Sequence, residues 1–446
     1  MRHGSMRWML LAGATVMGLV ACGGGGDAGK SATSQGATAD PTTAIGGDAT
    51  APVSITMWHA NIEIAADTMQ AIADKFHAAN PSITVNVEQG STGDTMLTKL
   101  TTVLGTEKYP DIAYVFGTDT PALARSDKVA DLTATVADPA FGWSDFFEGE
   151  RAVATVAGKV VAIPALVDNL ALVYNKKLFA DAGVAEPTAD WSWDDYKAAA
   201  KQLTNVDDKI FGASYPVSGD EDTVWRFWPM IWQQGAKAIS DDGKTATFDD
   251  PAFATALEVL RSMAIDDKSM YIDASSESVV KLFEASKIAM TITGPWALYD
   301  IGAAKIDYGV VPLPGFNGDH RTVSGPDNWM VFDNGPERVA AAAAFLQFLT
   351  QPEQDAVWSV GIGNMPVRNA TKDTPEWATA TKETPAYQQF LDNFANSKDA
   401  RPQTVAYPAY SAALGEQIAA VLLGQSSVED ALSAATTNGD AALADA

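Results

Sequence analysis

The segment KIAMTITGPW, residues 287–296, carries the clearest structural information in this chain. Its residues Ile288 to Thr293 combine apolar and β-branched side chains, which is typical of a buried β-strand. Gly294-Pro295 should end that strand, because glycine permits unusual backbone dihedrals and proline fixes φ and lacks an amide donor. Trp296 follows at the break. An indole at the end of a buried strand could line a cleft between two lobes, so we expect Trp296 to contact a ligand.

The composition argues against several classes of protein. With 446 residues, the chain is long enough to form two domains. A formal net charge of −26 disfavours binding to nucleic acid or to a bare anionic membrane surface, because both would repel it. A single cysteine forms no intrachain disulfide, and four histidines argue against a histidine-rich metal centre. We therefore expect neither a metal nor a cofactor.

The N-terminus has the features of a targeting segment. Residues 1–21 place two arginines before the apolar run Met9–Ala21, which is too short to span a bilayer. The run ends in Leu-Val-Ala-Cys22, which resembles the bacterial lipobox, where the cysteine is lipidated; the alternative is a chance cysteine after an ordinary signal peptide. Residues 22–51 are rich in Gly, Ser, Thr and Ala and predict a flexible tether. We expect a lipid-anchored protein on the extracytoplasmic face of the cell membrane.

The next segments predict strands and helices in alternation. Val53–Met57 and Ile83–Val87 alternate apolar and polar residues, and the segment between them places Met69, Ile72 and Phe76 on one helical face. This strand–helix–strand order predicts parallel pairing with a right-handed crossover, and hence an α/β fold.

Ligands of such sheets bind beyond the carboxyl ends of the strands. Trp58 and His59 follow the first strand, and Asp119 follows a third strand at Asp111–Phe116. We expect Trp58 to offer a stacking surface and His59 a hydrogen-bonding group in a cleft, with Asp119 close by. The alternatives are that Trp58 packs in the core or a loop and that Asp119 is a solvated loop carboxylate.

Several motifs, taken in order, resemble those of bacterial extracellular solute-binding proteins of the sugar-binding family, the maltose-binding protein group. Residues 287–296 are similar to the family's xAMxxxGPW strand, residues 163–179 to its IPxxxxxxxLxYNKxLF pattern and residues 187–204 to PxxWxWxxYxxAAKxLT, whereas Ser286 stands where glycine is usual. The resemblance covers about residues 53–435. It implies a two-lobed periplasmic-binding-protein fold (type II), with a mostly parallel sheet flanked by helices in each lobe and the GPW strand in the hinge.

The resemblance also implies boundaries for the two lobes. We expect the N-lobe to contain residues 52–162 and 297–350, and the C-lobe to contain residues 163–296 and 351–446.

Further candidate ligand-binding residues follow from the resemblance: Asp168, Asn169, Trp225, Trp228, Asp327, Asn328 and Arg368. A carboxylate at position 168 can accept two hydroxyl donors, although Asp-Asn is also a common turn sequence. Trp225 and Trp228 share one helical face with Trp232, which we expect to belong to the core. The Arg368 guanidinium could donate to a ligand hydroxyl or to Asp168.

The implied function is that of a substrate-binding lipoprotein of an ABC importer. It would bind a carbohydrate, best a neutral oligosaccharide, between two closing lobes and deliver it to a membrane permease, working as a monomer and not as an enzyme. Alternatives are binding of a polyol phosphate or a polyamine on the same fold, a glycan-binding sensor, or an extracellular glycan hydrolase. A phosphate would need several cations, of which only Arg226 and Arg368 stand out. The chain also has no nucleophile elbow, zinc motif or Walker loop.

Overall fold

The computed structural model describes residues 52–60 and 63–445. The expected signal peptide at residues 1–21, the tether at residues 22–51 and the lipidated Cys22 lie outside these residues. Within the described ranges, no helix is both long enough and apolar enough to cross a membrane.

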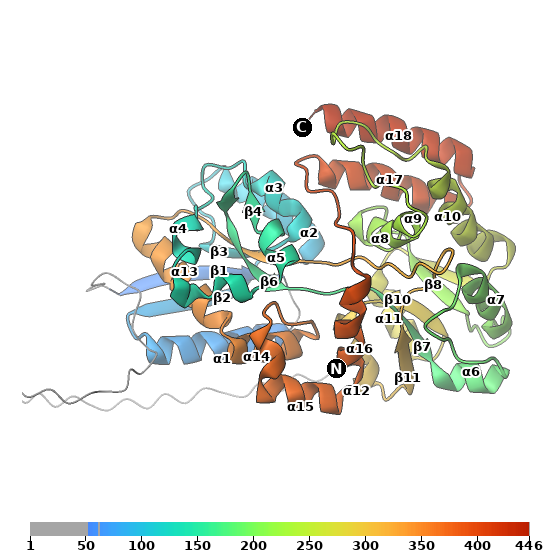
Figure 1. Ribbon diagram of the computed structural model, residues 1–446, viewed down its shortest axis with the longest axis horizontal. Coiled ribbons are helices and arrows are strands. Elements are labelled where there is room, and N and C mark those ends of the chain that lie inside the picture. The colour runs from blue at the N-terminus through green and yellow to red at the C-terminus, as the bar shows by residue number, and fades with distance from the viewer. Residues whose placement is uncertain (1–51, 61–62, 446) are drawn as a thin grey trace, which may run out of the picture. The chain divides into compact units, whose positions relative to one another are not determined.

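Five strands of the described chain form one sheet, in the order β2-β1-β3-β12-β6 (Figure 1). They are β1 (Val53–His59), β2 (Ile83–Gln89), β3 (Ile112–Phe116), β6 (Ala162–Leu166) and β12 (Asp327–Val331). Strand β1 pairs in parallel with β2 and with β3, which confirms the predicted strand–helix–strand pairing. Strand β12 runs antiparallel to both of its neighbours, β3 and β6. We call this the first sheet.

Both faces of the first sheet are covered by helices. On one face Tyr114 of β3 packs in a core with residues of α1 (Glu63–Ala79), α13 (Pro336–Leu349) and α14 (Pro352–Ile362). On the other face Ala113 and Val115 pack against α2 (Gly93–Leu104). Successive β3 side chains therefore enter different cores, as the period of two in a strand requires. The predicted apolar face of α1, with Met69, Ile72 and Phe76, is buried.

A second sheet contains the segment with which the sequence analysis began. Strands β10 (Met290–Thr293) and β11 (Tyr308–Val311) flank β7 (Ala171–Asn175), and both run antiparallel to it. All β10 side chains are buried, and the strand ends at Gly294-Pro295, which confirms a buried strand before that break.

The antiparallel pairing of this sheet differs from the mostly parallel sheet that we expected in each lobe. From β10 the chain continues through α12 (Leu298–Ala303) and returns in the same direction on the other edge of β7, so both neighbours oppose β7. Parallel pairing does occur nearby, between β8 (Ala213–Pro216) and β9 (Met270–Asp273).

The remaining elements are two short strands and the other α-helices of the described chain. They are α3 (Thr120–Leu123), α4 (Thr133–Val136), α5 (Glu148–Val153), β4 (Thr155–Val156), β5 (Lys159–Val160), α6 (Lys176–Ala182), α7 (Trp193–Leu203), α8 (Glu221–Trp225), α9 (Trp228–Trp232), α10 (Pro251–Arg261), α11 (Ser276–Glu284), α15 (Pro375–Glu383), α16 (Ala386–Asn393), α17 (Tyr407–Leu422) and α18 (Val428–Ala444). Two helix starts are capped by side chains: Ser192 and Asp195 form a capping box on α7, and Asp250 caps α10 ahead of Pro251.

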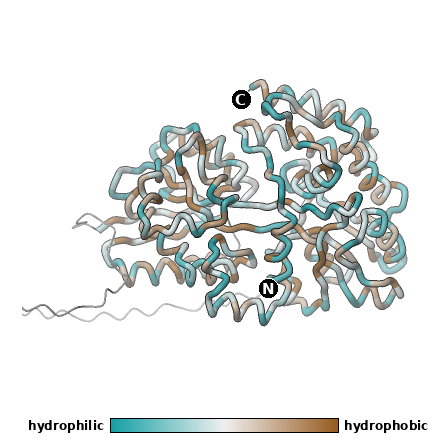
Figure 2. The backbone as a smooth tube through the Cα atoms, viewed as in Figure 1, coloured by the Kyte–Doolittle hydropathy of each residue, from teal (hydrophilic) through white to brown (hydrophobic). Residues whose placement is uncertain are grey.

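The second sheet also lies between two cores. Residues of α7 to α10, α17 and α18 pack on one side, and residues of α11, α12, α15 and α16 pack on the other. Figure 2 shows hydrophobic residues concentrated along the strands, whereas the helices alternate between hydrophobic and hydrophilic residues. This distribution follows from burial of strands on both faces and of helices on one.

Strand pairing and helix packing correct three of the expected lobe boundaries. Strand β6, most of which we placed in the C-lobe, belongs to the first sheet, and β11, which we placed in the N-lobe, belongs to the second. Helix α14 packs in both cores, with Trp358 in the core of the first sheet and Ala356 in a core of the second, so it does not belong to the C-lobe alone. The chain therefore crosses between the two sheets more often than the expected boundaries allow.

Candidate ligand-binding site

A cavity of about 680 Å³ is lined by residues from both sheet regions. The first sheet contributes Tyr114 and Phe116 of β3 and Leu166 of β6. Helices α8, α11 and α12 and the loop before α17 contribute the opposite wall, which includes Trp225 and Arg401. Its volume falls within the range of about 300–1,000 Å³ that is usual for small-molecule sites.

Asp327 enters the cavity from the first residue of β12. The ladder between β12 and β6 shifts register between Asp327 and Asn328, so Asp327 pairs with Leu166 across an irregularity. Its carboxylate accepts hydrogen bonds from the Tyr114 hydroxyl at 2.5 Å and from the Gly117 amide at 3.2 Å. These donors hold the carboxylate at the edge of the first sheet.

Asp168 lies in the loop between β6 and β7, at the transition between the two sheets. Its backbone carbonyl accepts from the Gly325 amide at 2.9 Å. The side chain is 6% exposed, and its Oδ1 is buried without a hydrogen-bond partner in the described residues. A Cβ atom at position 325 would lie 2.2 Å from this Oδ1, so only glycine leaves room for the carboxylate.

Two indoles stack against each other in the cavity wall. Trp225, the last residue of α8, and Trp296, in the turn after β10, have ring centroids 5.4 Å apart and an interplanar angle of 23°. The Trp225 Nε1 is buried and has no hydrogen-bond partner among the described groups. A Cβ at Gly294 would lie 1.8 Å from the Trp296 ring, so the glycine before Pro295 also gives the indole its place.

A buried cation, Arg401, lies beside this indole pair and is 7% exposed. Its guanidinium carbon lies 5.5 Å from the Trp225 ring centroid. Its NH1 group donates to Glu221 at 2.9 Å, and the same carboxylate accepts from the hydroxyls of Tyr407, at 2.9 Å, and Ser411. Glu221 therefore neutralises Arg401 and fixes its position.

The buried carboxyl groups are in an unfavourable environment for charge. Burial raises the pKa of Asp168 well above its usual range, the neighbouring charge of Asp327 raises it further, and Arg401 lowers it. Burial also raises the pKa of Asp327 to about 6, although the hydrogen bond from Tyr114 opposes this effect. Glu150, buried behind them with Oε2 unpartnered, likewise has its pKa raised by burial.

The mouth of the cavity is formed by α11 and α12. It carries the exposed Tyr299 and the carboxylates of Glu284 and Asp300. The ammonium group of Lys281 bonds to Glu277 at 2.7 Å. The rim is therefore polar and predominantly acidic around one exposed aromatic ring.

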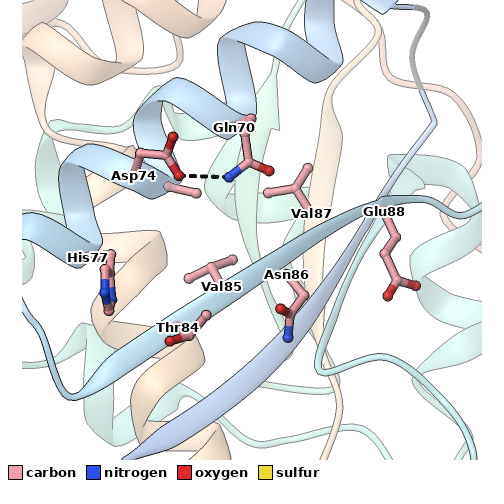
Figure 3. Close-up of a pocket in the computed structure, with 9 residues that line it drawn as sticks. Gln70, Asp74, His77, Thr84, Val85, Asn86, Val87 and Glu88 are labelled. Atoms are coloured by element: carbon pink, nitrogen blue, oxygen red, sulfur yellow. Dashed lines mark hydrogen bonds between the residues drawn. The ribbon is translucent and has the colours of Figure 1, made fainter. Parts of the chain in front are cut away.

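A second, smaller hollow of about 360 Å³ lies between α1 and the edge strand β2 (Figure 3). Polar side chains such as Gln70 and Asp74, which share a hydrogen bond of 2.8 Å, line it together with His77. The hollow contains no indole and none of the candidate residues from the sequence. Across the ranges 52–60 and 63–445, no group of three or more His, Cys, Asp or Glu side chains is placed to hold a metal ion.

The profile of the bacterial extracellular solute-binding protein family matches residues 60–356, which is more than half of the chain. The chain belongs to this family. It is 28% identical over 313 residues to the diacetylchitobiose binding protein DasA of Streptomyces coelicolor, and the match covers 68% of each chain. It is 23% identical over 355 residues to the sn-glycerol-3-phosphate-binding periplasmic protein UgpB of Escherichia coli, a match that covers 74% of this chain and 78% of the relative.

Solved structures of solute-binding proteins share the fold. The cyclic alpha-maltosyl-1,6-maltose binding protein from Arthrobacter globiformis superimposes with a TM-score of 0.74 at 28% identity, covering 89% of this chain and 100% of that one. The comparison confirms the expected two-lobed periplasmic-binding-protein fold.

Four of the residues singled out in this solute-binding protein from its sequence meet in the cavity: Asp168, Trp225, Trp296 and Asp327. They come from four separate segments of the chain, and the β6–β7 loop, α8, the turn after β10 and the start of β12 bring them together.

Four other candidates are in the interior rather than in the cavity wall. Trp228 is fully buried and donates to Tyr407 at 2.9 Å. Asn169 donates to the Phe390 carbonyl, and Asn328 donates to the Thr120 hydroxyl. Arg368 does not reach Asp168: it donates to the carbonyls of Phe141 and Gly142 and lies over the Phe146 ring.

The three candidates at the ends of β1 and β3 do not line the cavity either. Trp58 is half-buried, donates to Glu88 at 3.3 Å and has the Lys99 ammonium 4.2 Å from its ring centroid. His59 and Asp119 are buried.

Glu221, Arg401 and Tyr114 were missed by sequence reasoning. Glu221 looked like an ordinary acidic residue in the first turn of a helix, and Tyr114 looked like one more apolar residue of a strand. The only available signal for Tyr114 was its position two residues before the carboxyl end of a strand in a parallel sheet.

Proposed function

We propose that this protein is an extracytoplasmic substrate-binding lipoprotein of an ABC importer that captures a carbohydrate in the cavity between its two sheets. The observation that carries the proposal is the stacked pair of Trp225 and Trp296 beside the carboxylates of Asp168 and Asp327. Indole faces can cover the apolar C–H faces of a sugar ring, and carboxylates accept hydrogen bonds from its hydroxyls.

The unpartnered polar atoms of the wall support the same proposal. Within residues 52–60 and 63–445, Asp168 Oδ1 lacks a donor and Trp225 Nε1 lacks an acceptor, each at a cost of about 1–3 kcal/mol. A sugar hydroxyl both donates and accepts, so one ligand class could satisfy both atoms. Two relatives with sugars in their names, diacetylchitobiose and cyclic alpha-maltosyl-1,6-maltose, are consistent with a carbohydrate.

A polyol phosphate is the second candidate, because one relative is named for sn-glycerol-3-phosphate. The cavity disfavours it. Its buried cation, Arg401, is already paired with Glu221, and Asp168 and Asp327 would repel a phosphate.

The proposal is tested by thermal shift and titration calorimetry of the full chain against neutral mono- and oligosaccharides, amino sugars, polyol phosphates and polyamines. Binding to the native state raises the melting temperature by mass action. Saturable binding of a sugar that is lost in Trp296→Ala is the expected result. Binding of a phosphate or a polyamine alone would overturn the carbohydrate assignment and leave the importer role.

Membrane attachment and the permease partner need their own test. We expect the chain expressed in a bacterium to fractionate with the cell membrane and Cys22→Ser to be released into the extracytoplasmic fraction. Crosslinking of the ligand-bound protein should recover a membrane permease. An unchanged distribution of Cys22→Ser would contradict the lipid anchor.

A further inference from the structure

The wall of the ligand cavity carries many more acidic than basic side chains. Seven carboxylates line it, against two cations, Lys281 and Arg401. The acidic residues are Asp168, Glu221, Asp222, Glu277, Glu284, Asp300 and Asp327. A neutral ligand would offer none of these acidic groups a positive partner inside a partly closed space.

Both cations of the wall are already paired. Arg401 bonds to Glu221 at 2.9 Å, and Lys281 bonds to Glu277 at 2.7 Å. Asp222 is also paired, with the buried Arg226 behind it. Among the described residues, no lysine or arginine forms an ion pair with Asp168 or Asp327, although the charge of Arg401 acts on both carboxyl groups without direct contact.

Asp168 is the more exceptional of the two. Asp327 accepts from Tyr114 and Gly117, whereas no described residue donates to the buried Oδ1 of Asp168. This oxygen and the Trp225 ring both border Gly325, so it lies beside the indole pair. An indole face attracts a cation, which adds to the attraction of the carboxylate.

We propose that the natural ligand is an amino sugar or an amino-substituted oligosaccharide, with its protonated amine placed beside Asp168. This inference rests on the proposed carbohydrate function and sharpens its ligand class. An ammonium group supplies both a positive charge and up to three N–H donors, whereas a hydroxyl supplies one neutral donor. Charge-assisted hydrogen bonds are about twice as strong as neutral ones, and a buried carboxylate gains most from them.

The test compares three β-1,4-linked disaccharides that differ mainly at C2: cellobiose with a hydroxyl, chitobiose with a free amine and diacetylchitobiose with an amide. The panel also includes the monosaccharides glucose and glucosamine, and the disaccharide maltose. Calorimetry of the full chain near neutral pH should show the amino sugar of each set binding at least tenfold more tightly than its hydroxyl and amide counterparts. The advantage should shrink with added salt, because screening weakens a charge–charge contact.

A matched pair of variants locates the amine. Asp168→Asn keeps the shape of the side chain and should abolish most of the amino-sugar preference while cellobiose binding changes less. Asp74→Asn removes the same charge from the hollow between α1 and β2 and should leave every affinity unchanged.

The two proposals fail in different ways. Sugar binding without a preference for the amine, or an equal loss for chitobiose and cellobiose in Asp168→Asn, would overturn the amino-sugar inference and leave carbohydrate binding intact. Absence of binding to every sugar, amino or neutral, would overturn the carbohydrate function itself and the inference with it.

Discussion

Two stacked indole pairs, which include the nearby residues Trp225 and Trp228, differ in their environment. Trp225 and Trp296 border the cavity, with centroids 5.4 Å apart; Trp228 and Trp232 are in the core, 6.4 Å apart, at a similar interplanar angle of 18°. The Trp228 Nε1 donates to Tyr407, whereas the Trp225 Nε1 has no partner within the described part of the chain. Stacking geometry alone therefore does not separate the two pairs; what separates them is that Trp225 and Trp296 line the cavity, whereas Trp228 and Trp232 do not.

The largest expected effect separates the two pairs by stability. Trp228→Ala removes a completely buried indole and should lower the free energy of unfolding by about 3–5 kcal/mol. Trp225→Ala removes a half-buried ring beside an existing cavity and should cost less than half as much. Urea denaturation of both variants measures the difference. Equal losses would mean that Trp225 is as much a core residue as Trp228.

The second effect separates them by ligand affinity. Trp225→Ala and Trp296→Ala should each weaken sugar binding by roughly ten- to a hundredfold, about 1.4–2.8 kcal/mol, because a central aromatic contact is lost. Trp228→Phe is the control, since it keeps an aromatic ring in the core and should bind normally if it folds. Calorimetry with the same sugar decides, and normal affinity in both cavity variants would remove the stacking role.

Buried aspartates extend the comparison from indoles to carboxyl groups. Asp327 faces the cavity, whereas Asp355 is in the interior and accepts from Thr371 at 2.5 Å and from Val367. Burial raises the pKa of each from 3.8 to about 6, so the folded state binds a proton more readily than the unfolded state. Their contribution to stability is complete below about pH 4 and is lost as the pH rises to about 6.

The third prediction follows from this loss of stability with rising pH. Between pH 4 and pH 7 the wild-type protein should lose on the order of 2 kcal/mol more stability than Asp355→Asn, which does not titrate at that position. Asp327→Asn should reduce the pH dependence of stability in the same way. It should also alter sugar affinity, whereas Asp355→Asn should leave sugar affinity unchanged. Denaturation at the two pH values, with calorimetry at one, checks both. A parallel pH dependence of wild type and Asp355→Asn would contradict the raised pKa.

The sequence predicted the elements of this fold better than their assignment to lobes. Alternation and the GPW break identified β1, β2 and β10, because these are local patterns. The lobe boundaries were wrong at β6 and β11 and incomplete at α14, which packs in both cores, since local patterns do not specify which sheet an element joins. That choice depends on pairings between residues more than a hundred positions apart.

The site was predicted in part for the same reason. Trp225 and Trp228 are three residues apart, which puts them on one face of a continuous helix, but α8 ends at Trp225 and α9 begins at Trp228. Pro229 in the first turn of α9 fits this break. Arg401 was not predicted because its partner Glu221 is 180 positions away, and neither residue stands out locally.

The smallest expected effect concerns Trp58, which the sequence placed in the ligand site. Its contacts are a 3.3 Å bond to Glu88 at the surface and a cation–π contact with Lys99, which together contribute about 1 kcal/mol. Trp58→Ala should therefore lower stability slightly and change disaccharide affinity less than twofold. Ala60, two residues further on, does line the cavity, so a longer chain of sugar rings extending past β1 would reach the Trp58 ring. An affinity loss in Trp58→Ala that appears only with longer oligosaccharides would mean that the site continues along the first sheet, and that the indole at the end of β1 belongs with the Trp225 pair rather than with the core.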